Sequence, residues 1–180
     1  MKKSAVFIDR DGTLIEEADY LARPEHLKLF PFAAEAVRLL NENDFLTVLI
    51  TNQSGVGRGF FDENNLREIH EKLISELAAQ GAKLDAIYYC PHKPNDDCAC
   101  RKPKTEMIKK AMKDFSIDLN ESWTIGDKAI DVETGTNAGT KTALVLTGYG
   151  IEEREKLTGK PDLIAGNLLE AAQTVCLPDI

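Results

Sequence analysis

Two aspartates one residue apart follow a short apolar run near the start of the chain. Asp9 and Asp11 come after residues 5–8, and Gly12 then lets the chain turn away. An unbroken apolar run is typical of a strand buried on both faces, where a charge is costly unless the strand's end uses it. In an extended segment residues i and i+2 point the same way. We therefore expect Asp9 and Asp11 to face one pocket, where they could share a metal ion, and Arg10 to point elsewhere.

A calcium-binding loop and a solvated strand end are the alternatives for this segment. Counted from Asp9, the glycine position of an EF-hand holds Leu14 and its bidentate glutamate position holds Tyr20, so the spacing excludes a calcium loop. A strand that ends in two solvated acids stays open on this segment alone. Residues elsewhere in the chain are needed to distinguish a metal site from a solvated strand end.

Composition limits the class of protein. The 180-residue chain has a formal net charge of −8, with acids and bases mixed along it, which disfavours nucleic-acid binding. Only four apolar residues precede Asp9, too few for a signal-peptide core, and no stretch approaches the ~18 apolar residues of a membrane span. We expect a single domain over residues 1–180 in a cytoplasmic protein, a monomer that binds neither nucleic acid nor membrane.

Strand and helix patterns alternate along the chain. This alternation predicts a three-layer α/β fold of the Rossmann-like kind, with a mostly parallel sheet, helices on both faces and ligands beyond the carboxyl ends of the strands. No segment is long enough for a separate lid, or cap, domain. The tail, residues 152–180, is predicted to form two short helices around residues 161–164. The predicted strands are 4–9, 45–51, 86–89, 122–126 and 142–146, and the predicted helices are 31–43, 62–81, 104–115 and one from 129.

Polar residues follow the second predicted strand. Thr51, Asn52, Gln53 and Ser54 supply hydroxyl and amide groups, and Gly55 frees backbone N–H groups, so this segment could hold an anion. An ordinary polar turn is equally compatible with it.

A third acid, Asp127, follows the strand predicted at 122–126, although it could instead cap the next helix. Asp131, one helical turn later, could support the site or be solvated. Arg101 and Lys102 stand just before a helix start marked by proline. A phosphate pocket with three carboxylates needs such cations.

The order Asp9-x-Asp11-Gly-Thr, Thr51, Lys102 and Gly-Asp127 resembles the haloacid-dehalogenase-like (HAD-like) phosphatases, up to about residue 150. The resemblance implies that Asp9 attacks phosphorus and forms an aspartyl-phosphate, while Asp11 protonates the leaving oxygen and then deprotonates water. It also implies Mg²⁺ held by Asp9, Asp127 and the Asp11 carbonyl, with Thr51 and Lys102 on the phosphoryl oxygens. A non-catalytic binding protein on this fold is disfavoured because all five residues are present.

Four metal-ligating residues lie in the loop 90–100: Cys90, His92, Cys98 and Cys100. Three cysteines and a histidine fit a closed, structural zinc site better than disulfides, which a cytoplasmic setting disfavours, or an iron–sulfur cluster. Zinc would order the loop and so place Arg101 and Lys102. Cys176 has no partner in the sequence and is predicted to be a buried apolar residue.

The zinc loop narrows the resemblance to a small cap-less branch whose members hydrolyse heptose 1,7-bisphosphate or histidinol phosphate. The loop sequences are similar to the heptose enzymes, but the short spacing from His92 to Cys98 is found in the histidinol-phosphate enzymes. A second phosphate would prefer cations, and a histidinol ammonium would prefer Glu16, Glu17 and Asp19, so both substrates stay open. The substrate contacts that the resemblance implies are Glu17, Tyr20, Asn52, Gln53, Ser54, Arg58, Arg101 and Lys128.

Overall fold

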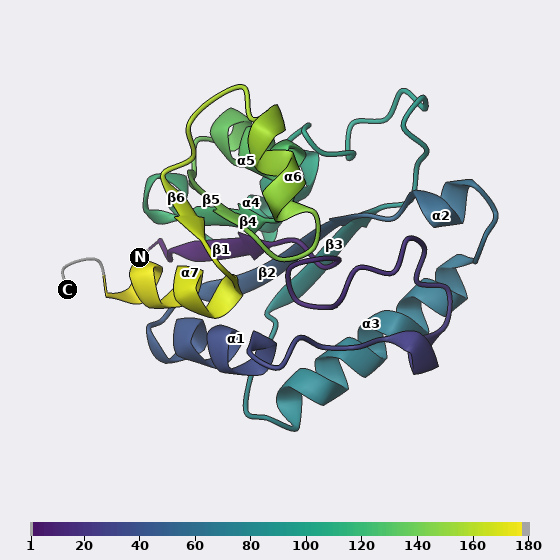
Figure 1. Cartoon of the computed structure of the whole chain (residues 1–180), viewed down its shortest axis with the longest axis horizontal. Coiled ribbons are helices and arrows are strands. Elements are labelled where there is room, and N and C mark those ends of the chain that lie inside the picture. The colour runs from purple at the N-terminus through teal and green to yellow at the C-terminus, as the bar shows by residue number, and fades with distance from the viewer. Residues whose placement is uncertain (1, 178–180) are drawn as a thin grey trace.

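One six-stranded sheet runs through the protein (Figure 1), as seen in a computed structural model that describes residues 2–177. Its order is β3-β2-β1-β4-β5-β6, and every neighbouring pair is parallel. The predicted parallel sheet is thereby confirmed. The strands are β1 (Ala5–Ile8), β2 (Leu46–Asn52), β3 (Ala86–Cys90), β4 (Trp123–Gly126), β5 (Lys141–Val145) and β6 (Leu163–Ala165).

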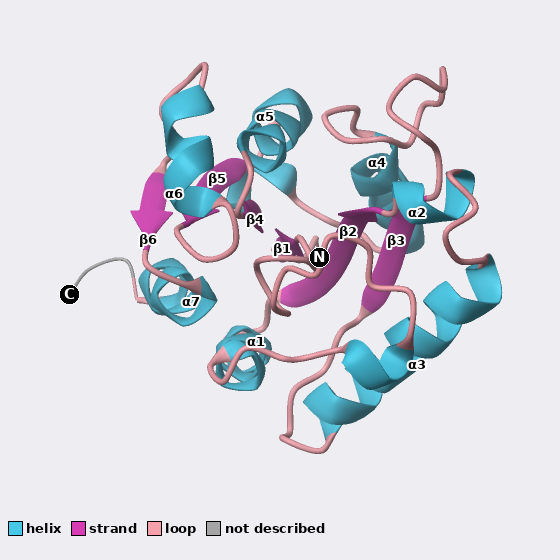
Figure 2. Ribbon diagram, turned by 45° about the vertical axis from the view of Figure 1, so that its right-hand side comes forward, coloured by secondary structure: helices cyan, strands magenta, loops and turns pink. Residues whose placement is uncertain are grey.

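Helices cover both faces of the sheet (Figure 2). The helices α1, α3 and α7 pack on one face, and α4 and α5 pack on the other, which confirms the predicted three layers. The α-helices are α1 (Ala33–Glu42), α2 (Ser54–Gly57), α3 (Glu63–Ala78), α4 (Glu106–Asp114), α5 (Ala129–Ala138), α6 (Gly150–Glu153) and α7 (Leu168–Cys176). The short 3₁₀ turns are η1 (Pro24–His26), η2 (Leu119–Glu121) and η3 (Arg154–Lys156).

Strand β1 lies inside the core on both faces. Its side chains alternate, so that Val6 and Ile8 join the core under α1, α3 and α7, while Ala5 and Phe7 join the core under α4. All four are 0% exposed. The unbroken apolar run is explained by this two-sided burial, which holds the residues after Ile8 in a fixed place at the carboxyl edge of the sheet.

The tail differs from its prediction. Helices do flank residues 161–164, but Leu163–Ala165 forms β6, whose Ala165 pairs with Val145 of β5. The segment is only three residues long and lies at the edge of the sheet, with Ile164 exposed, so it lacks the apolar run that identifies the inner strands. Cys176 ends α7 and is half-buried against the core, where burial raises the pKa of its thiol.

Long connections are confined to the carboxyl edge. Residues 9–32, between β1 and α1, contain the turn η1 and isolated bridges from Ile15 to Asp11 and Leu29, so this part of the described chain holds no lid domain. Helix α3 begins after Asp62, whose Oδ1 accepts a hydrogen bond from the Asn65 N–H at 2.9 Å and so caps the helix. Within residues 2–177, no helix is both long enough and apolar enough to cross a membrane.

Candidate active site

Three neighbouring strands end at one cavity of about 410 Å³. Because β2, β1 and β4 are adjacent and parallel, the residues that follow them meet at the same edge. Thr51 and Asp127 are buried and do not line the cavity, and Arg58 is exposed outside it. The predicted site residues that line it are Asp9, Asp11, Glu17, Tyr20, Asn52, Gln53, Ser54, Arg101, Lys102 and Lys128.

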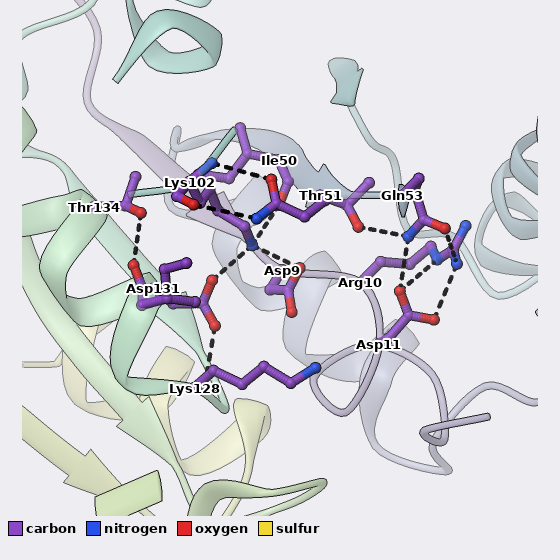
Figure 3. Close-up of polar contacts among 12 residues, drawn as sticks. Asp9, Arg10, Asp11, Ile50, Thr51, Gln53, Lys102, Lys128, Asp131 and Thr134 are labelled. Carbon is purple, nitrogen blue, oxygen red and sulfur yellow. Dashed lines mark hydrogen bonds and ion pairs between the residues drawn. The ribbon is translucent and has the colours of Figure 1, made fainter. Parts of the chain in front are cut away.

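Lys102 lies between two carboxylates (Figure 3). Its Nζ is 2.8 Å from Asp9 Oδ1 and 2.6 Å from Asp131 Oδ1. Burial opposes the charge of Lys102, but the charges of Asp131 and Asp9 prevail and raise its pKa. Asn52 holds the backbone of Lys102, accepting from its N–H at 3.0 Å and donating to its C=O at 3.4 Å. Asp131 is therefore a buried support of the site and not a solvated acid.

Asp127 is fully buried and only half satisfied. Its Oδ2 accepts a hydrogen bond from the Tyr149 N–H at 2.9 Å, whereas its Oδ1 has no partner among the described residues. Burial, together with the charge of Asp9, raises the pKa of Asp127 to about 8. Asp127, Asp9 and Asp131 each offer an oxygen, all within 4.8 Å of one another. An orphaned carboxylate oxygen in a group of hard oxygen donors fits a magnesium ion.

Asp11 is paired with its neighbour Arg10, contrary to the expectation that Arg10 points elsewhere. Arg10 Nη2 is 2.9 Å from Asp11 Oδ1, and Arg10 also lines the cavity. The strand ends at Ile8, so the alternation of an extended chain does not continue to Asp11. Instead Leu14 N–H donates to the Arg10 carbonyl at 3.0 Å and closes a turn. The charge of Arg10 and hydrogen bonds from Arg10 and Gln53 outweigh burial and lower the pKa of Asp11.

Three charged residues that line the cavity, Glu17, Asp19 and Lys128, form a second group with the neighbouring ring of Tyr149. Lys128 Nζ is 3.0 Å from Glu17 Oε2 and 5.1 Å from the centre of the Tyr149 ring. The Tyr149 hydroxyl donates to Asp19 Oδ1 at 3.3 Å. Tyr149 was missed by the sequence reasoning, although residues 147–150 follow another strand of the same sheet and contain two glycines, a signal of a loop at that edge.

The four residues of loop 90–100 converge on one point. Sγ of Cys90 lies 3.7 Å from Cys98 Sγ and 2.9 Å from Cys100 Sγ, and His92 Nδ1 lies 3.2 Å from Cys100 Sγ. These separations exceed the ~2.05 Å of a disulfide and suit four ligands around one ion. The donor set fits zinc. Arg101 Nη1, directly after the loop, donates to the His92 carbonyl at 3.2 Å.

Comparison with known proteins identifies the family. Residues 99–171 match the model described as "HAD-hyrolase-like". The chain is 38% identical to the D-glycero-D-manno-heptose-1,7-bisphosphate 7-phosphatase of Thermosynechococcus vestitus, over 98% of this chain and 97% of the relative. The chain belongs to the HAD-like phosphatases. A second HAD-like relative, the D-glycero-beta-D-manno-heptose-1,7-bisphosphate 7-phosphatase of Haemophilus ducreyi, is 40% identical over 94% of this chain and 97% of its own length.

Solved structures of HAD-like phosphatases share the fold. The heptose 1,7-bisphosphate phosphatase of Bordetella bronchiseptica, complexed with magnesium and phosphate, matches with a TM-score of 0.92 and 32% identity, over 98% of this chain and 99% of that one. The corresponding enzyme of Burkholderia thailandensis matches with a TM-score of 0.73 and 29% identity, over 94% of this chain and 96% of that one. HAD-like phosphatases use Mg²⁺, and this chain is a phosphoric monoester hydrolase of that family.

Proposed function

We propose that this enzyme removes the 7-phosphate of D-glycero-D-manno-heptose 1,7-bisphosphate. The observation that carries the proposal is the shared name of its relatives: proteins between 32% and 41% identical to the chain are named 7-phosphatases of this sugar. The same observation favours heptose bisphosphate over histidinol phosphate.

The reaction divides between two aspartates. Asp9 attacks phosphorus, and the bond from phosphorus to the sugar oxygen breaks. That oxygen receives its proton from Asp11 in the fraction of the enzyme in which Asp11 is protonated, because the charge of Arg10 favours the carboxylate form. Asp11 then takes a proton from water, whose oxygen attacks the aspartyl-phosphate and frees Asp9 and inorganic phosphate. Lys102, already 2.8 Å from Asp9, is the cation for the phosphoryl oxygens, and Thr51 is proposed to assist it.

Asp9 and Asp127, together with the Asp11 carbonyl, are proposed to hold magnesium, with Asp131 beside them. A bound magnesium ion neutralises the repulsion between the anionic nucleophile and the anionic phosphate. The unpartnered, buried Oδ1 of Asp127 supports this assignment.

The part of the substrate that is not hydrolysed would contact other residues that line the cavity. Arg101 and Lys128 line the cavity and would bind the 1-phosphate, with Glu17, Tyr20 and the segment 52–54 around the sugar. Arg58 lies outside the cavity, so its contact with substrate stays a prediction.

Loop 90–100 is proposed to hold structural zinc through Cys90, His92, Cys98 and Cys100. With four protein ligands such a site is closed to water, and bound zinc cross-links the loop that carries Arg101. A cytoplasmic location remains our prediction. A monomer over a single domain that binds no nucleic acid remains our prediction, to be checked by light scattering and gel-shift measurements.

Phosphate release with magnesium tests the proposal. Purified protein should hydrolyse at least one anomer of the heptose 1,7-bisphosphate faster than histidinol phosphate, and Asp9→Asn should lose activity. A preference for histidinol phosphate would overturn the substrate, and full activity of Asp9→Asn would overturn the mechanism.

A further inference from the structure

Arg10, Asp11 and Gln53 form a closed ring of hydrogen bonds at one wall of the cavity (Figure 3). Arg10 donates from Nη2 to Asp11 Oδ1 at 2.9 Å and from Nε to Oδ2 at 3.1 Å. Gln53 accepts from Arg10 Nη2 at 2.9 Å and donates to Asp11 Oδ2 at 2.9 Å. Both oxygens of Asp11 are therefore held, and the plane of the carboxylate is fixed by a two-pronged pair that only arginine can make.

The ring is itself anchored from helix α3. Arg10 Nη1 lies 3.3 Å from His70 Nε2. Because a guanidinium only donates, His70 Nε2 must be the acceptor, which requires a neutral ring. Burial and the charge of Arg10 lower the pKa of His70 to about 3, in agreement with that state. His70 is 7% exposed and does not line the cavity, so it reaches the site only through Arg10.

Burial gives this arrangement its rigidity. Arg10 is 1% exposed, so its guanidinium cannot exchange protein partners for water. A buried cation with three partners in fixed directions keeps a single side-chain conformation. The Asp11 carboxylate, which accepts two hydrogen bonds from this guanidinium, is therefore held in one orientation as well.

We propose that Arg10, anchored by His70, is a positioning residue that orients the Asp11 carboxyl for proton transfer. The inference rests on the proposed role of Asp11, which gives a proton to the leaving oxygen when the bond to phosphorus breaks. Arg10 exchanges no proton and forms no covalent bond. Arg10 contributes by fixing the direction in which the Asp11 oxygens point.

Leaving groups of different basicity test the proposal. A sugar oxygen needs a proton as it leaves, whereas 4-nitrophenolate does not. We therefore compare the first turnover, by rapid quench, on heptose 1,7-bisphosphate and on 4-nitrophenyl phosphate. In Arg10→Lys the sugar reaction should slow by about 100-fold, within the range of general acid catalysis, and the nitrophenyl reaction by less than about 5-fold. His70→Leu should show the same imbalance, smaller in size.

Two results would overturn the proposal: equal losses on both substrates, which indicate a role in phosphate binding or folding, or no loss at all. If Arg10→Lys does not fold, His70→Leu carries the test, with circular dichroism as the folding check. Arg67→Lys, an exposed arginine on the same helix α3, is the matched control and should keep the wild-type ratio. If the wild type fails on heptose bisphosphate, the proposed substrate is wrong, and histidinol phosphate, also an alkyl phosphate, supplies the ratio instead.

Discussion

Lys102 Nζ and Asp131 Oδ1 are 2.6 Å apart, and neither side chain is more than 3% exposed. Lys102 also pairs with Asp9, so its loss would leave two buried carboxylates without their cation. We expect Lys102→Met to lower the free energy of unfolding by about 3–5 kcal/mol and to abolish activity. Urea denaturation without magnesium measures the first effect. Lys72→Met, which breaks a more exposed pair with Glu76 on α3, should cost less than about 1 kcal/mol. Similar costs for the two variants would contradict this account.

Acid should weaken the fold through His70. The pKa of His70 is about 3 in the folded protein, whereas an ordinary histidine has a pKa of 6.5. Below pH 6.5 the unfolded chain therefore binds a proton at His70 that the folded protein does not bind. The stabilisation is thus complete above pH 6.5 and is lost as the pH falls towards 3. Between pH 6 and 5 the unfolding free energy of His70→Gln should depend on pH less steeply than that of the wild type, by up to about 1.4 kcal/mol per pH unit. His26→Gln, at an exposed histidine, should keep the wild-type slope.

Gly12 is required by the close approach of Asp127. Its φ is +79°, and a Cβ atom at this position would collide with Asp127 Oδ2. Gly12→Ala should displace Asp127 and reduce kcat by at least about 100-fold, since small misplacements of catalytic groups are costly. Gly139→Ala shares the backbone strain, with φ +83°, but meets no atom within 4 Å. That variant should lose about 1–2 kcal/mol of stability and keep its kcat. Equal kcat values for the two variants would rule out the collision.

Zinc should affect catalysis only by fixing the position of the loop that precedes Arg101. We expect Cys98→Ser to keep the fold largely intact, to bind less zinc and to show lower substrate affinity or turnover, because Arg101 is tethered to the His92 carbonyl of the same loop. Zinc per chain by elemental mass spectrometry and kcat/KM by phosphate release are the measurements. Cys176→Ser, far from the loop in α7, should change neither. Unchanged kinetics together with full zinc content in Cys98→Ser would refute this prediction.

Residues that directly follow the strands could be placed from the sequence. The apolar run before Asp9 and the alternation of strands with helices predict both the parallel sheet and the edge where Asp9 and Asp127 meet. Spacing alone also predicts the cluster of Cys90, His92, Cys98 and Cys100, since these four residues are close in the chain.

Contacts between distant elements could not be placed in the same way. Arg10 turns towards the cavity because β1 stops at Ile8, and its anchor His70 comes from a helix sixty positions further on. Asp131 is buried beside Lys102, with which it forms an ion pair. Strand β6 is too short to show the hydrophobic alternation by which a strand is recognised in a sequence. Each of these depends on which elements pack together, which the local pattern does not contain.

The strand order also sets when the enzyme can first work during its synthesis. β1 leaves the ribosome first, yet it pairs with both β2 and β4, and Asp127 follows β4. A nascent chain that ends before β4 therefore carries Asp9, the proposed nucleophile, without Asp127, the acid proposed to complete the magnesium site. We therefore expect fragments released before β4 is made to be inert towards phosphate esters.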